Sequence, residues 1–108
     1  MAKKTITGRW HITSMELWDQ DFIDAEVPGY IEFTQDGLGD FQFGYVRCDI
    51  DWKGTERDGQ PAAEFSFEGM DEMEPTSGRG WCVLNDGNLS GQFMFFHGDE
   101  SGFTAKRA

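Results

Sequence analysis

The chain has 108 residues, with nine Lys and Arg against twenty Asp and Glu and a formal net charge of −11. This length suits a single domain, residues 1–108, with one hydrophobic core. The acidic excess argues against nucleic acids and anionic membranes as partners, because both are bound through Lys and Arg. No apolar run follows Met1–Thr7, and no stretch approaches about 18 apolar residues. We therefore expect neither a signal peptide nor a membrane helix, and place the protein in the cytoplasm.

Short segments in which polar and apolar residues alternate recur along the chain, separated by turn-forming residues. This spacing is typical of antiparallel strands, and ten Phe, four Trp and two Tyr suit half-buried pleated surfaces. In the first strand, Trp10, Ile12 and Ser14 are expected on one face. The predicted strands, in chain order, are residues 8–15, 30–34, 40–43, 46–53, 63–68, 79–84, 89–97 and 103–107.

Residues 16–27 interrupt the alternation between the first two strands. Trp18 and Phe22 stand four apart, as on one face of a short helix, and Pro28 would end that helix. We therefore expect a short helical segment between the first and second strands, with these two rings directed towards the sheet.

The same segment carries five carboxylates and no basic residue. Asp19, Asp21 and Asp24 could ligate a hard cation such as Ca²⁺ or Mg²⁺, but Ile23 stands where an EF-hand loop places its third acid. Two other interpretations stay open at this point. The segment is either a solvated acidic face with its rings packed inward, or a lid over a ligand.

Three further segments depart from simple alternation. At Gly44 the apolar phase shifts from odd to even positions, which indicates a bulge or a tight turn. Residues 69–78 are rich in Met and acid and contain Pro75, so we expect a loop there. Residues 93–96 are apolar on both faces, which indicates a strand buried on both sides beneath a covering segment.

The two ends of the chain carry a recognisable pair of features: Gly8-Arg9-Trp10 opens the first strand, and Lys106-Arg107 closes the last. This pair resembles the calycin barrels, the lipocalins and fatty-acid-binding proteins, which open with Gly-x-Trp. The resemblance implies a single antiparallel barrel of about eight strands whose base is closed by Trp10. It also implies that Arg107 packs over the indole, a contact worth about 0.5–2 kcal/mol. Trp10 as an ordinary core residue is the alternative.

Three other segments, residues 16–22 (ELWDQDF), 77–81 (SGRGW) and 98–103 (GDESGF), are similar to a family of small, uncharacterised bacterial proteins. The similarity extends over nearly the whole chain. It implies a cytoplasmic bacterial protein, and it brings no catalytic residue with it.

The central strands carry a stripe of carboxylates. These side chains either face solvent or, if the apolar faces form an interface, line an interior. In an interior, burial would raise their pKa values and permit general acid–base chemistry, with Arg47 and Arg79 as partners. The stripe consists of Glu32, Asp49, Asp51, Glu64 and Glu68.

Other signals for chemistry are weak. His11 and His97 lack ligands at metal-binding spacing, and no nucleophile elbow, phosphate loop or dinucleotide fingerprint is present. Cys48 and Cys82 lie in apolar strand segments and are interpreted as small buried hydrophobes. We therefore expect no metal, no cofactor and no catalysis.

The preferred function is that of a small non-catalytic binding domain, with a small ligand in the barrel mouth. The alternative is a protein-interaction module or homodimer with an acidic face, suggested by aromatic residues in the exposed phase (Trp18, Tyr30, Tyr45, Trp81 and Phe96). A carboxylate-based enzyme is the third hypothesis. The candidate binding residues are Trp18, Asp19, Asp21, Phe22, Glu64, Glu68, Arg79 and Trp81.

Overall fold

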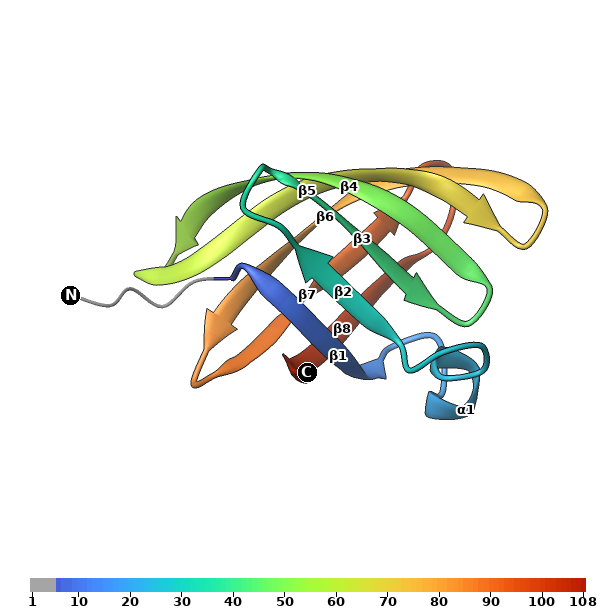
Figure 1. Ribbon diagram of the computed structural model, residues 1–108, viewed down its shortest axis with the longest axis horizontal. Coiled ribbons are helices and arrows are strands. Elements are labelled where there is room, and N and C mark those ends of the chain that lie inside the picture. Colours follow the sequence, from blue (N-terminus) through green and yellow to red (C-terminus); the bar gives the residue numbers. More distant parts are fainter. Residues whose placement is uncertain (1–5) are drawn as a thin grey trace.

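The computed structural model describes residues 6–108, which form a closed barrel of eight antiparallel strands (Figure 1). Each strand pairs with the next, and β8 pairs with β1, so the predicted all-β barrel is confirmed. Residues 1–5, which include most of the segment that argued against a signal peptide, lie outside the described part. None of the described helices is long and apolar enough to cross a membrane. The strands are β1 (Gly8–Met15), β2 (Tyr30–Phe33), β3 (Leu38–Phe43), β4 (Val46–Arg57), β5 (Gln60–Asp71), β6 (Glu74–Asn85), β7 (Asn88–Phe95) and β8 (Glu100–Arg107).

The expected helix between the first two strands is present as a single turn, α1 (Gln20–Ile23). Two-residue turns join β3 to β4, β4 to β5, β5 to β6 and β6 to β7. The phase shift at Gly44 is therefore a tight turn. The expected loop at residues 69–78 is wrong: β5 continues to Asp71, turns at Glu72–Met73, and β6 begins at Glu74. This hairpin extends past the barrel rim, so its residues have no buried face. The alternation of apolar and polar residues that predicts a strand is therefore missing there.

A bulge in β1 changes which residues face the core. Ile12 pairs with Ala105, and Ser14 then pairs with Thr104, so one residue of β1 is unpaired between them. Met15 is buried in consequence, whereas Ser14 is exposed and bonds to the Thr104 hydroxyl at 2.6 Å. The expectation that Ser14 shares the inward face of Trp10 and Ile12 is therefore wrong.

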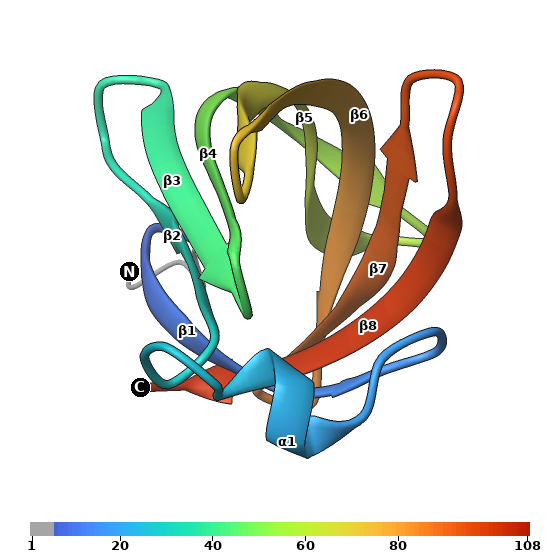
Figure 2. The same cartoon turned by 90° about the vertical axis from the view of Figure 1, so that its right-hand side faces the viewer.

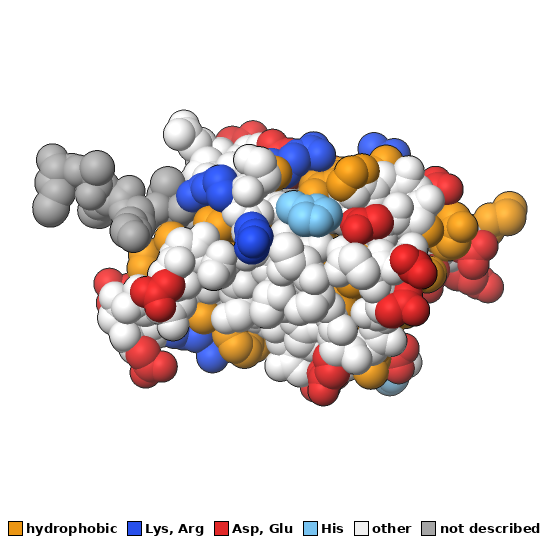
Figure 3. Space-filling model, turned by 90° about the horizontal axis from the view of Figure 1, so that it is seen from below, with side chains coloured by type: hydrophobic (Ala, Val, Ile, Leu, Met, Phe, Trp, Pro, Cys, Tyr) orange, Lys and Arg blue, Asp and Glu red, His pale blue; other side chains and the backbone are white. Residues whose placement is uncertain are grey.

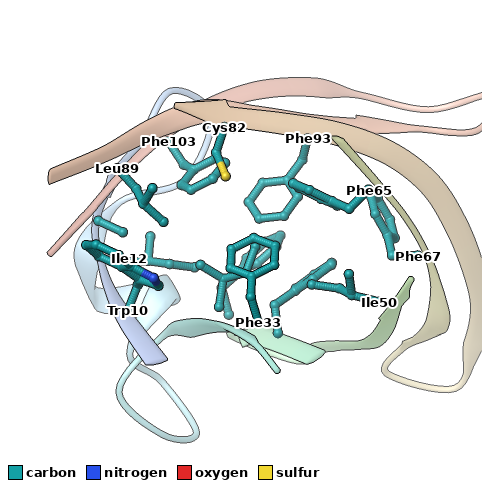
Figure 4. Close-up of a cluster of buried hydrophobic side chains, with 14 of the residues drawn as sticks. Trp10, Ile12, Phe33, Ile50, Phe65, Phe67, Cys82, Leu89, Phe93 and Phe103 are labelled. Carbon is teal, nitrogen blue, oxygen red and sulfur yellow. The ribbon is translucent and has the colours of Figure 1, made fainter. Parts of the chain in front are cut away.

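Phenylalanine rings fill the barrel interior (Figure 4). Phe93 lies at the centre of this cluster, with ring centroids 4.7 Å from Phe41 and 4.6 Å from Phe103. Gly80 faces the same interior, and a Cβ there would lie 2.6 Å from the ring of Phe65 and 2.4 Å from the Gln92 carbonyl oxygen. The absence of a side chain at Gly80 makes room for the ring. Such packing matches an eight-stranded barrel, whose interior is just wide enough for side chains.

Trp10 closes the base of the barrel, as the terminal motif predicts. Its side chain is 1% exposed, and Nε1 donates a hydrogen bond of 2.8 Å to the Ile6 carbonyl. The Arg107 guanidinium lies 3.9 Å from the centre of the indole, and Nη1 donates to the Thr7 carbonyl at 2.7 Å. The first and last strands are thus joined across the ring as well as through their backbones.

Candidate functional site

The end of the barrel opposite Trp10 is closed by residues just before and within α1. The ring of Trp18 lies 5.0 Å from that of Phe43 and 6.3 Å from that of Phe95, measured between centroids. Phe22 lies 6.4 Å from Phe43 and 6.0 Å from Tyr45. Both Trp18 and Phe22 are half-buried against the core cluster. The rings of this segment therefore pack inward over the barrel mouth, which Figure 2 views end-on.

Hydrogen bonds hold the segment in this position. The Asp19 carboxylate caps α1 by accepting from the Phe22 amide at 3.0 Å, and the Ile23 carbonyl accepts from the Gly44 amide at 3.0 Å. Gly44 has a φ of 58°, and a Cβ there would lie 2.4 Å from the Phe22 ring. Glycine is therefore required at this turn both by its backbone conformation and by the approach of Phe22.

Asp24, like Asp19, accepts hydrogen bonds from the protein itself. Asp24 accepts hydrogen bonds from the Gly29 amide at 2.7 Å and from Gln20 at 2.9 Å. Burial alone would raise the pKa of Asp24, but these two bonds, together with the electrostatic effect of His11, outweigh it and lower that pKa. Across residues 6–108 no group of three or more His, Cys, Asp or Glu side chains is placed to hold a metal ion. Asp21 is exposed on the first turn of α1.

The surface of this end combines apolar and acidic side chains. We define the capped end as residues 16–27, 44–45, 70–74 and 96–100, which contain no Lys or Arg. A backbone hydrogen bond of 3.0 Å from Glu72 to Tyr45 joins two of its segments. Of the seven large hydrophobic residues that are exposed in the described chain, six lie here: Leu17, Val27, Tyr45, Met70, Met73 and Phe96. Its carboxylates are Glu16, Asp19, Asp21, Asp24, Glu26, Asp71, Glu72, Glu74, Asp99 and Glu100.

These ten carboxylates are half of the twenty in the chain. Figure 3 shows acidic and hydrophobic side chains gathered at the end away from the grey N-terminal residues. Met73 and Phe96 project furthest into solvent, with 88% and 72% of their surface exposed. The capped end therefore combines six of the seven exposed large hydrophobic residues of the described surface with half of the carboxylates.

The carboxylate stripe lies on the outer wall of the barrel. Asp49 is directly opposite Asp40 on β3 and Glu68 on β5, so three carboxylates stand in a row across three strands. Asp49 and Glu68 are exposed, and so are Asp51 and Glu64. The solvent-facing interpretation of these four residues is thus the correct one, and the barrel interior is lined by apolar side chains.

Three of the predicted binding residues meet in a groove of about 360 Å³ on this outer wall. Glu64 on β5 pairs with Trp81 on β6, and Arg79 precedes Trp81 on β6, nearer the capped end. The Arg57 guanidinium stacks on the Trp81 ring at 3.8 Å, because the twisted β4–β5 hairpin bends back over β6. Glu68 lies outside this groove, in a hollow beside Phe96. Trp18, Asp19, Asp21 and Phe22 lie at the capped end, so the eight candidates do not form one site: four lie there, three in the groove, and Glu68 in the hollow beside Phe96.

Several residues deviate from their expected environment. Tyr30 is 8% exposed, since the Arg9 guanidinium covers its ring at 3.9 Å, so its assignment as an exposed aromatic is wrong. Burial and the 2.5 Å bond that its hydroxyl donates to Asp40 raise the pKa of Tyr30 to about 12. Phe96 is exposed, contrary to the expectation of a strand buried on both faces. Met70 and Met73 are absent from the predicted binding residues, because a loop is expected from the sequence at residues 69–78.

Comparison with protein-family models, with curated proteins and with solved structures finds no match for this chain. The site must therefore be interpreted from its own geometry.

Proposed function

We propose that this protein is a non-catalytic interaction domain that binds a basic protein partner through its capped end. The observation that carries the proposal is that six of the seven large hydrophobic residues exposed within residues 6–108 lie together with half of the carboxylates. Aromatic and Met side chains are enriched at protein interfaces. A surface of one charge sign accelerates the approach of a partner of the opposite sign.

The composition of this surface defines the partner. A segment with Lys or Arg on one face and apolar residues on the other would satisfy the carboxylates and cover Met73 and Phe96 together. A second copy of this chain fits less well, because two capped ends would bring ten carboxylates against ten. We therefore favour a basic amphipathic segment of another protein over a homodimer.

A small ligand in the barrel mouth is supported less well than a protein partner. Such a ligand would have to displace Trp18, Phe22 and the rings that they contact at Phe43 and Phe95. Native mass spectrometry of protein purified from cells tests this alternative, since a retained ligand would add mass to the folded protein. A relationship to the calycin barrels is supported by the Trp10–Arg107 contact, and a cytoplasmic location by the free thiols of Cys48 and Cys82.

A synthetic amphipathic helix of Leu and Lys tests the interaction proposal. Its binding is measured by titration calorimetry at several salt concentrations. We expect binding that weakens as salt rises, because exposed charges are screened. The double variant Met73→Ser/Phe96→Ser should bind at least about tenfold more weakly, since it removes the two most exposed apolar contacts.

Leu38→Ser is the matched control. Leu38 is 54% exposed but lies at the start of β3, towards the Trp10 end. Its substitution should leave the affinity for the peptide unchanged. Equal losses from Leu38→Ser and from the double variant, or no binding by the unsubstituted protein, would contradict the proposal.

A further inference from the structure

Two hollows on the outer wall of the barrel meet at Phe96. One, of about 520 Å³, includes Asp49, Glu68, Pro75 and Ser77 in its lining. The other, of about 560 Å³, is lined by Met94 and Phe95 and also by the charged side chains of Arg79 and Glu100. Phe96 lines both. An acidic hollow and a more apolar hollow therefore lie side by side, with one exposed aromatic ring between them.

The backbone fixes Phe96 at this position. Its amide donates a hydrogen bond of 2.8 Å to the Ser77 carbonyl on β6, which ties the β7–β8 turn to the wall. The next residue, His97, has a φ of 55°, and its ring centroid lies 4.2 Å from that of Phe96. Phe96 is thus exposed because the turn holds it there, and burial of its ring by a partner would require no rearrangement of the backbone.

The acidic hollow contains charges that the protein itself leaves uncompensated. Asp49 and Glu68 are directly opposite each other on β4 and β5, and like charges in that arrangement destabilise a sheet. Neither carboxylate forms an ion pair with another described residue. Asp40, on the far side of Asp49, accepts a hydrogen bond from Tyr30 and likewise forms no ion pair within residues 6–108. A cation placed between Asp49 and Glu68 would relieve this repulsion.

We propose that the hollow between Phe96 and the Asp49–Glu68 pair receives a lysine or arginine side chain of the basic partner, with a neighbouring apolar residue of the partner in the Met94 hollow. This inference rests on the proposed function and names the partner's recognition element. The stem of Lys or Arg is apolar and would pack on the Phe96 ring, while the charged head would reach both carboxylates. The partner must then carry a cationic residue next to an apolar one in order to fill both hollows.

The experiment uses the same Leu and Lys peptide and the double variant Asp49→Asn/Glu68→Gln. Both substitutions keep side-chain shape, and both residues are exposed, so the fold should persist, as far-UV circular dichroism would verify. We expect about a tenfold loss of affinity at low salt and a shallower dependence of affinity on salt. The control is Glu56→Gln/Asp58→Asn, because it removes two carboxylates at the opposite end of the barrel.

The outcomes separate this inference from the proposed function. If Asp49→Asn/Glu68→Gln and the control Glu56→Gln/Asp58→Asn lose affinity equally, the peptide responds to net charge alone and the subsite is wrong. If Asp49→Asn/Glu68→Gln binds like the unsubstituted protein while Met73→Ser/Phe96→Ser does not bind, the capped end is the docking surface but the subsite is wrong. Absence of any peptide binding would overturn both. Loss of affinity in Asp49→Asn/Glu68→Gln and also in Phe96→Ser alone, with Glu56→Gln/Asp58→Asn unchanged, supports the subsite.

Discussion

The contact between Arg107 and Trp10 should measurably stabilise the closed barrel. These residues lie opposite each other where β1 meets β8, the strand pair that joins the two ends of the chain. The guanidinium is 3.9 Å from the ring centre, which is within the range of a cation–π contact. Replacement of Trp10 by Leu and of Arg107 by Met, singly and together, gives a double-mutant cycle that isolates this contact from the other interactions of each residue.

The expected magnitudes follow from burial. Trp10 is 1% exposed, and Trp-to-Ala changes in cores cost about 3–5 kcal/mol. Leu retains part of that packing, so we expect Trp10→Leu to cost about 2–3 kcal/mol. Arg107 is itself exposed, which places the coupling energy near the middle of the usual range, at about 1 kcal/mol. Arg107→Met removes the hydrogen bond to the Thr7 carbonyl whether residue 10 is Trp or Leu. The contribution of this bond therefore cancels from the cycle.

Urea unfolding followed by far-UV circular dichroism measures the four free energies without relying on Trp fluorescence. Lys106→Met is the matched control, because Lys106 lies on β8 opposite His11 and so on the other face from Arg107. Its coupling to Trp10→Leu should be below about 0.3 kcal/mol, the usual limit of additivity. An Arg107–Trp10 coupling no larger than that of Lys106 would refute the stacking argument.

Three further predictions concern the core. Gly80→Ala should destabilise the protein by about 1–3 kcal/mol in urea unfolding, because its Cβ would meet the Gln92 carbonyl oxygen at 2.4 Å. Gly54→Ala, with the nearest atom at 3.8 Å, should be close to neutral. Burial raises the pKa values of Cys48 and Cys82 to about 12, so both thiols should resist maleimide labelling at pH 8 until urea is added. These thiols and Tyr30, also raised to about 12, lose protons more easily when unfolded. The free energy of unfolding should therefore fall as pH rises from about 9 towards 12, and less steeply in Tyr30→Phe.

The sequence predicts the barrel well where one face of each strand is buried. The first predicted strand has the observed bounds of β1, and Gly8-Arg9-Trp10 with Arg107 identifies how the base closes. Prediction fails where strands leave the barrel, as at residues 70–77. Alternation carries no information there because both faces are largely exposed. The turn at Glu72–Met73 also lacks the usual Gly or Asn, although Glu72 has a φ of 56°.

The candidate site was harder to predict because it depends on contacts between distant segments. Trp18 and Phe22 were recognised as one apolar stripe, and they do pack over the mouth. The exposure of Phe96 could not be read from the apolar run at residues 93–96, since only the β7–β8 turn places its ring outside. The stacking of Arg57 on Trp81 depends on the twist of a long hairpin, which residue spacing does not encode.

The packing of the interior explains why the binding surface is proposed on the outside. An eight-stranded barrel has room for side chains or for one small ligand in its mouth. Here the ring of Phe93 contacts those of Phe41 and Phe103 at the centre, and Trp18 with Phe22 covers the end. Larger side chains inside leave less volume for a ligand, whereas the turns at the capped end can vary without loss of the core. An aromatic core therefore provides a rigid support for an acidic and apolar docking surface.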